Sequence, residues 1–283
     1  MATLVHATET AFMKSQLGVE SAWGNAVDST IPLGSVTLTP SIKRVTNVFT
    51  ARGILLPAVM SIGREHTEVA FDGKATYQEM GYFIEDVVSD AANPAVTSYS
   101  VEAGGLQIPG CVVTGWTLKG NRDEVTLSGS MLGQVHAVHA ATPLGAPGEQ
   151  IPVSAAAVLL SVDGAVNHAF EWELAVSDMW GGAAFIGDTT FHTMMQKTIG
   201  ATFKFKVEAA AAGLAYLTTT PGEQVACSIS TSADNGCSME FLFNAIVGEP
   251  DTFSDEDGVY IIGHNLTVMN DDTAAIATTI TPA

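Results

Sequence analysis

The sequence predicts a mainly β protein made of two tandem β-sandwich or barrel domains, each with one short amphipathic helix. Strands of alternating apolar residues, separated by Gly and Thr, recur along the 283 residues. An order of strands, helix and hairpin in residues 41–133 is repeated in residues 165–282. A Pro- and Gly-rich stretch separates the two copies. We therefore expect an arm at residues 1–32, a first domain at 33–140, a linker at 141–152 and a second domain at 153–283.

The arm has no sustained hydrophobic period. We expect it to be helical around Thr8–Leu17 and extended through Gly24–Pro32. A terminal segment of this kind is expected to bury nothing in its own chain, and either to contact a neighbouring copy or to be a frayed terminus.

The first domain contains strand material at residues 34–62 and a short strand at Glu68–Asp72. An apolar stripe with helical spacing then runs from Tyr77 to Val88. Thr76 and Glu79 have the spacing of a capping box, which predicts where this helix begins.

A hairpin closes the first domain. Val112–Leu118 and Val125–Met131 each alternate with a period of two, and Gly120-Asn121 predicts the turn between them. The two strands should therefore pair directly.

The second domain repeats these elements. Phe170–Val176 alternates apolar residues with Glu171 and Glu173, which predicts that both glutamates face outward. A strand at Thr202–Val207 leads into an Ala-rich helix at Glu208–Leu217. Strands at Tyr260–Val268 and Ala274–Ile280 are expected to form the final hairpin, with a turn at 270–272.

The charge is strongly acidic and uneven. The net charge is −19, and residues 142–283 contain 17 acidic residues but only 3 basic ones. Such a chain lacks the basic patch that nucleic-acid binding requires. No apolar stretch approaches the ~18–20 residues of a membrane helix, and no signal peptide is visible. An acidic surface serves solubility, or allows a polyanion to pass without binding.

The three cysteines, Cys111, Cys227 and Cys237, fit neither a disulfide framework nor a zinc spacing. The odd number favours reduced thiols, although Cys227 and Cys237 could face each other across a hairpin.

The sequence contains no motif of a catalytic, cofactor or metal site. His136 and His139 are three residues apart, but no carboxylate or cysteine ligand lies nearby in the sequence. The acidic run Asp251–Asp257 differs from a calcium loop, because Phe253 and His264 occupy positions that need carboxylates. We therefore expect no enzyme, no cofactor and no metal.

Three stretches carry a resemblance to a known family. They are Gly18–Val27 followed by Ser35–Pro40, then Gly73–Val88, and finally Gly110–Gly120 followed by Val125–Gly133. In this order they resemble the arm and first strand, the strand-to-helix segment and the closing hairpin of the tail tube, or major tail, proteins of long-tailed bacteriophages. The resemblance covers the first half directly and the second half through the repeat.

The resemblance implies a structural virion protein with tail-tube-like β domains that assembles into stacked rings. The rings form an acidic-lumen conduit for DNA ejection, and the protein is made in the cytoplasm of the bacterial host. A duplicated chain implies three chains in a ring with pseudo-six-fold symmetry, and a single copy implies six. Expected partners are further copies of the chain, the tape measure protein and genomic DNA in the lumen, and the tail tip and head-proximal terminator proteins, with no membrane.

Two sets of residues are candidates for these contacts. The arm and the loop from Arg52 to His66 are expected to stack rings. The stacking candidates are Trp23, Arg52, Leu55, Leu56 and Arg64, and the lumen candidates are Glu171 and Glu173. Two alternatives stay open, namely another self-assembling β tube of the secretion-system kind, and a β-sandwich binding module with an exposed aromatic platform.

Overall fold

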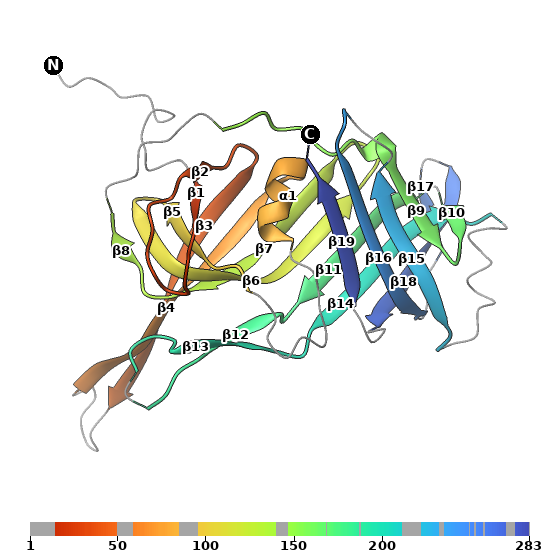
Figure 1. Cartoon of the computed structure of the whole chain (residues 1–283). Helices are drawn as coiled ribbons and strands as arrows, with labels where there is room; N and C mark the ends of the chain where they lie inside the picture. Colours follow the sequence, from red (N-terminus) through yellow and green to blue (C-terminus); the bar gives the residue numbers. More distant parts are fainter. Residues whose placement is uncertain are drawn as a thin grey trace.

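The computed structural model describes residues 15–49, 59–84, 96–139, 147–167, 169–186, 188–210, 222–231, 235–248, 250–251, 253–256, 258–269 and 275–282. In these residues the chain is mainly β-structure with one α-helix, as the sequence predicts (Figure 1). The elements are β1 (Gln16–Val19), β2 (Ile31–Pro32), β3 (Val36–Phe49), β4 (Val59–Lys74), α1 (Tyr77–Phe83), β5 (Tyr99–Ala103), β6 (Leu106–Gly120), β7 (Val125–Gly133), β8 (Ala137–Val138), the 3-10 helix η3 (Ala155–Ala157), β9 (Val158–Val162), β10 (Ala165–Asn167), β11 (Ala169–Ser177), β12 (Trp180–Ala183), β13 (Thr193–Gln196), β14 (Gly200–Glu208), β15 (Gln224–Thr231), β16 (Ser238–Val247), β17 (Ser254–Glu256), β18 (Val259–Met269) and β19 (Ile276–Thr281).

One antiparallel sheet runs from the first half of the chain into the second. Its strands follow the order β3-β4-β7-β6-β11-β14-β18. The junction is the pairing of Trp116–Gly120 in β6 with Trp172–Val176 in β11. The two halves are therefore joined by backbone hydrogen bonds.

A second layer of strands covers the inner face of this sheet. In the first half it contains β1, β2, β5, β8 and the start of β6. In the second half it contains β19, β16, β15, β9 and β10. Helix α1 lies between the halves and contacts β19 (Figure 1).

The core between the layers is rich in large apolar side chains. Phe71 stacks on Phe83 of α1 at 4.5 Å between ring centroids. The ring centroid of Trp116, in the first half, lies 6.1 Å from that of Phe241, in the second half. Because Trp116 and Phe241 come from different halves, the hydrophobic core is continuous across the junction.

Helix α1 begins where the sequence predicts and ends earlier. The Thr76 side chain accepts a hydrogen bond from the Glu79 backbone N–H, which satisfies a free donor of the first turn. The helix ends at Phe83, and Ile84 has extended backbone angles, so the prediction that it continues to Val88 is wrong at Ile84. The Gly in its last turn reduces the helical propensity. The predicted 85–88 segment lies outside the described residues.

The predicted second helix falls mostly outside the described residues. Glu208 is the last residue of β14, so the prediction of a helix is wrong at Glu208, and residues 211–217 are not described.

The N-terminal arm is part of the fold from Ser15 onward. Gln16–Val19 form β1, which pairs with β5 and β2, so the helix predicted here is wrong. Leu17 is fully buried. The expectation that the arm buries nothing is therefore also wrong for residues 15–32, because the edge of β5 supplies backbone partners and the core accepts Leu17. Residues 1–14 lie outside the described residues.

The first predicted hairpin is confirmed and the second is wrong. β6 and β7 pair directly, and the Asn121 side chain accepts from the Asp123 and Glu124 backbone N–H groups to form the turn. β18 pairs with β14 and the end of β16, whereas β19 pairs with Ser238–Phe243 of β16. The two strands of the expected hairpin therefore pair with successive parts of β16 and not with each other. This is possible because β16 crosses from one layer to the other.

The cysteines have free thiols. Cys227 lies opposite Phe243 in the β15–β16 pair, and all three cysteines are buried and unbonded. Burial raises the pKa of the Cys227 thiol to about 12.

The predicted linker ends against the start of α1. Pro152 bridges to Thr76, and the Tyr77 backbone N–H donates to the Ile151 carbonyl at 3.1 Å. Residues 150–153 therefore pack against the first half, and their contacts fix the C-terminal end of the predicted linker.

Candidate functional site

The outward face of the long sheet is polar. Glu171 and Glu173 lie on it as predicted, since Trp172, Leu174 and Val176 point into the core. The strands on either side contribute hydroxyl, lysine and carboxylate side chains at the same alternate positions.

Cross-strand ion pairs run along this face. Glu171 contacts Lys206 at 2.7 Å and also contacts Lys119, so it bridges β14 and β6. Glu173 lies 3.8 Å from Lys204. The hydrogen bond from Lys119, and then that from Lys206, hold the pKa of Glu171 below its usual value. Both predicted lumen residues are therefore paired with lysine.

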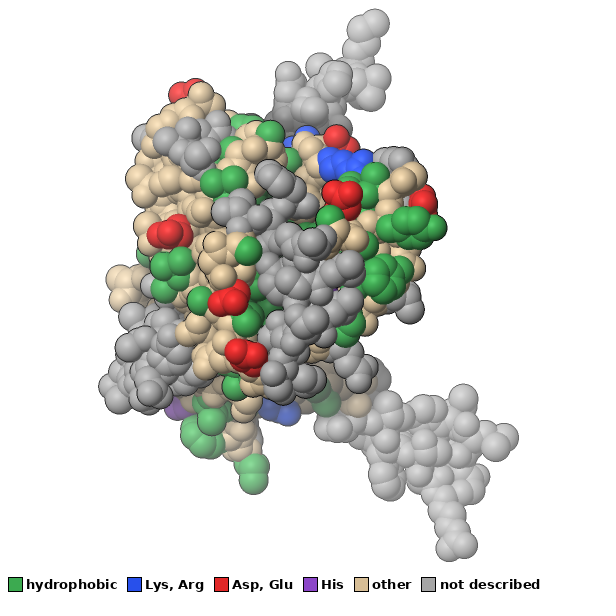
Figure 2. Space-filling model, turned by 90° about the vertical axis from the view of Figure 1, so that its right-hand side faces the viewer, with side chains coloured by type: hydrophobic (Ala, Val, Ile, Leu, Met, Phe, Trp, Pro, Cys, Tyr) green, Lys and Arg blue, Asp and Glu red, His purple; other side chains and the backbone are tan. Residues whose placement is uncertain are grey.

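The described charges of the polar face are nearly balanced. The outward positions hold lysines Lys43, Lys74, Lys119, Lys204 and Lys206, and carboxylates Glu68, Asp72, Glu171, Glu173 and Glu208, and Glu124 just before β7 pairs with Lys74 at 3.4 Å. Because the whole chain carries a net charge of −19, most of its acidic excess lies off this face. Figure 2 shows another side of the molecule, where acidic side chains are separated by apolar and neutral polar ones.

Two ribbons extend from one end of the sheet (Figure 1). One is the far part of the β3–β4 hairpin, and the other is β12–β13 with its connection. They meet where the Glu65 N–H donates to the Thr189 carbonyl at 2.8 Å and where His66 lies 4.9 Å from the Phe191 ring. Large apolar side chains are exposed on both ribbons, namely Ile42, Val45, Phe185, Ile186 and Met195. Exposed apolar groups at a projecting end are typical of an interaction surface.

The predicted stacking residues fall in different places. Arg64 is exposed on the projecting part of β4. Trp23 is half-buried and its indole N–H donates to the Gly110 carbonyl at 3.0 Å, so it holds the arm to its own chain. Arg52, Leu55 and Leu56 lie outside the described residues.

The free edge of β3 is covered over its first part only. The Val36 N–H donates to Glu79 at 2.9 Å and the Leu38 N–H donates to the Ser15 hydroxyl at 2.9 Å, both away from β4. Pro40, the next residue with this orientation, has no N–H. Ile42 is the first residue beyond these caps whose N–H points away from β4, toward the open edge of the sheet.

A cleft of about 820 Å³ lies between the polar face and the β12–β13 ribbon. Its walls include Lys43, Glu68, Trp180, Phe191 and Lys197. Trp180 is almost fully buried, so its ring packs in the cleft wall and is not the exposed aromatic platform expected of a sugar-binding module.

The two closely spaced histidines have separate partners. His136 lies 3.4 Å from Glu65, and His139 lies 3.6 Å from Glu102. Asp28 also lies beside His139, and the three groups of Asp28, Glu102 and His139 converge. Sequence analysis missed this cluster, because residues 28, 102 and 139 have no spacing that indicates a shared site.

The described part of the acidic run contains a strand, because Ser254–Glu256 form β17, which pairs with Val259–Ile261 at the start of β18. The Asp251 N–H donates to the Gly263 carbonyl at 2.9 Å, and the Asp255 side chain accepts from the Gly258 N–H. The prediction of a solvated acidic loop is therefore wrong for Ser254–Glu256, because the edge of β18 supplies backbone partners.

No protein-family model matches this sequence, and no curated protein matches it either. Within the described residues, no helix combines the length and the apolar character needed to cross a bilayer.

Proposed function

We propose that this chain is a structural subunit that assembles into stacked rings, as the tail tube protein of a long-tailed bacteriophage does. The single observation that carries the proposal is the order in which strands pair within each half of the chain. In the first half the order is β3-β4-β7-β6-β5, and in the second it is β11-β14-β18-β16-β15. These orders support a duplication, with β3 equivalent to β11 and β6 equivalent to β16.

The β6–β11 junction provides a template for contacts between chains. Within the chain, β11 pairs with the end of β6. If the halves are equivalent, β3 of the next chain should pair in the same way with the chain at the end of β16. After β16 the chain continues beside β18, where Gly248 donates to the Asn265 carbonyl and Asp251 to the Gly263 carbonyl, both at 2.9 Å. The outer edge of this segment is where β3 of the next chain is proposed to pair. Three chains joined in this way give a ring with pseudo-six-fold symmetry.

Ring closure removes strand edges that a monomer leaves open. The caps on Val36 and Leu38, together with Pro40, restrict pairing between chains to β3 from Ile42 onward. The projecting ribbons then offer their exposed apolar side chains to the next ring. Stacking of this kind is a head-to-tail contact that extends without closing, so it produces a tube.

The polar face of the sheet is the proposed lumen surface. Its hydroxyl groups and paired charges offer DNA no row of unpaired cations, which suits a conduit for DNA ejection. This differs in detail from a uniformly acidic lumen, because the described carboxylates on the face are nearly balanced by lysines.

Negative-stain electron microscopy of the purified chain over a concentration series tests the proposal. We expect hollow rings or tubes with three-fold or pseudo-six-fold end views. The variant Ile42→Pro removes the first outward N–H without removing a bond to β4, so it should stay folded and fail to form rings. Ile42→Thr, which keeps the N–H, is the matched control and should assemble. A chain that stays monomeric at every concentration contradicts the proposal.

A β-sandwich binding module is the second candidate, and the cleft beneath the β12–β13 ribbon favours it. Its walls combine hydroxyl groups from Thr39, Ser41 and Ser130 with the Phe191 ring. A glycan-binding screen of the unmodified chain and of Phe191→Ala distinguishes the two candidates. If the unmodified chain is monomeric and binds a glycan that Phe191→Ala does not bind, the result supports the binding module alone.

A further inference from the structure

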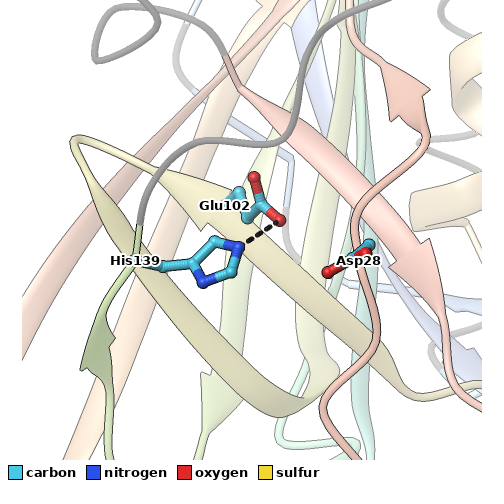
Figure 3. A group of neighbouring side chains, drawn as sticks. All are labelled: Asp28, Glu102 and His139. Carbon is cyan, nitrogen blue, oxygen red and sulfur yellow. Dashed lines mark ion pairs between the residues drawn. The ribbon is translucent and has the colours of Figure 1, made fainter.

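Three side chains from separate segments converge at one end of the first half (Figure 3). Asp28 belongs to the arm between β1 and β2, Glu102 to β5, and His139 follows β8. Each offers one ligand atom, and these atoms lie within 4.8 Å of one another. His139 Nε2 lies 3.6 Å from Glu102 Oε1.

Two of the three groups are held in place by the fold. Glu102 is 3% exposed, and its carboxylate accepts hydrogen bonds from Gln16 Nε2 at 2.6 Å and from the Ser29 N–H at 3.2 Å. The His139 N–H donates to the Gly105 carbonyl at 3.1 Å, which fixes the backbone that carries the imidazole. Asp28 is exposed and lies at the mouth of the cluster, next to Ser29.

The charges of the cluster favour a cation. A buried carboxylate is costly unless hydrogen bonds and an opposite charge compensate for it. With a protonated imidazole, the two carboxylates still leave the cluster negative. A divalent ion neutralises both carboxylates, and it binds the neutral form of histidine.

The ligand types and distances favour zinc. Carboxylate oxygens and imidazole nitrogen bind zinc at about 2.0–2.2 Å, which places neighbouring ligands of a tetrahedral site about 3.4 Å apart. The His139–Glu102 separation is already close to this value. Calcium and magnesium prefer a shell made of oxygen ligands only, so the imidazole disfavours them.

We propose that Asp28, Glu102 and His139 bind one zinc ion, with water in the remaining position. The ion joins the arm to β5 and to the segment after β8, so zinc fastens the described part of the arm, residues 15–32, to the body of the protein. The proposal is independent of the assembly of the chain into tubes.

Zinc titration of the full-length chain after treatment with a chelator tests this site. Calorimetry should give one zinc ion per chain, and zinc should raise the melting temperature more than magnesium or calcium does. The variants Asp28→Asn and His139→Gln should each weaken zinc binding by about ten-fold or more. Both side chains are at least partly exposed, so the variants should keep the circular dichroism spectrum of the native fold.

His192→Gln is the matched control, because His192 is exposed and lies outside the cluster. It should bind zinc as the unmodified chain does. Absence of stoichiometric binding at micromolar zinc overturns the proposal. Equal zinc affinity in the unmodified chain and in both cluster variants overturns it as well, and equal stabilisation by magnesium removes the assignment to zinc.

Discussion

Three buried glutamates of the first half and two glutamates of the polar face are used in opposite ways. Glu20, Glu79 and Glu102 are 8%, 2% and 3% exposed, and they accept hydrogen bonds largely from backbone N–H groups. Glu171 and Glu173 are about one-third exposed and pair with lysines on neighbouring strands. The same residue type therefore fixes chain segments in one region and balances surface charge in the other.

The difference shows how burial sets the energetic value of a carboxylate. An exposed ion pair gains little, because water already solvates both charges. A buried carboxylate that accepts backbone N–H groups cannot be lost without leaving those donors unsatisfied. Glu79 illustrates this, because it joins α1 to the start of β3 through the N–H groups of Gly34, Ser35 and Val36.

The largest effect is expected for Glu79→Ala. Loss of the carboxylate leaves up to three backbone donors unsatisfied, so the free energy of unfolding should fall by about 3 kcal/mol. Urea denaturation followed by circular dichroism measures the change. Glu173→Ala is the comparison from the polar face and should cost less than about 1 kcal/mol. Equal losses in the two variants would remove the distinction between the regions.

A smaller effect is expected for Trp23→Phe. The substitution keeps an aromatic ring but deletes the N–H that donates to the Gly110 carbonyl, so the free energy of unfolding should fall by about 1 kcal/mol. Amide exchange in residues 15–32 should also become faster, because this bond holds the arm. Unchanged exchange in the arm would show that Trp23 does not fasten it.

The smallest effect is expected for Glu171→Gln, and it should depend on pH. Lysine contacts lower the pKa of Glu171 in the folded chain below the ordinary value of 4.5. The carboxylate therefore stabilises the fold above that value, and the contribution disappears as the pH falls through the folded-state pKa. The variant should lose less than about 1 kcal/mol at pH 7 and nothing in strong acid. Denaturation at several pH values checks this, and a loss that is the same at every pH contradicts it.

Local features of the fold were predictable because they depend on neighbouring residues. The alternation around Trp172 and Leu174 correctly orients Glu171 and Glu173, and Asn121 forms the predicted turn. Thr76 caps α1 as its spacing from Glu79 indicates. Contacts between distant segments were not predictable. The pairing of β19 with β16 and the docking of β1 on β5 depend on which strand edges remain open after collapse.

The sequence by itself determined the mainly β class, the start of the helix, the first hairpin and the outward face of β11. These follow from periodicity and capping, which act over a few residues. Only the tertiary structure decided that β6 and β11 join the halves into one sheet, and that the arm is built into the fold. It also brought Asp28, Glu102 and His139 together. The physical reason is that strand pairing and burial join residues far apart in the chain, and local spacing carries no record of those partners.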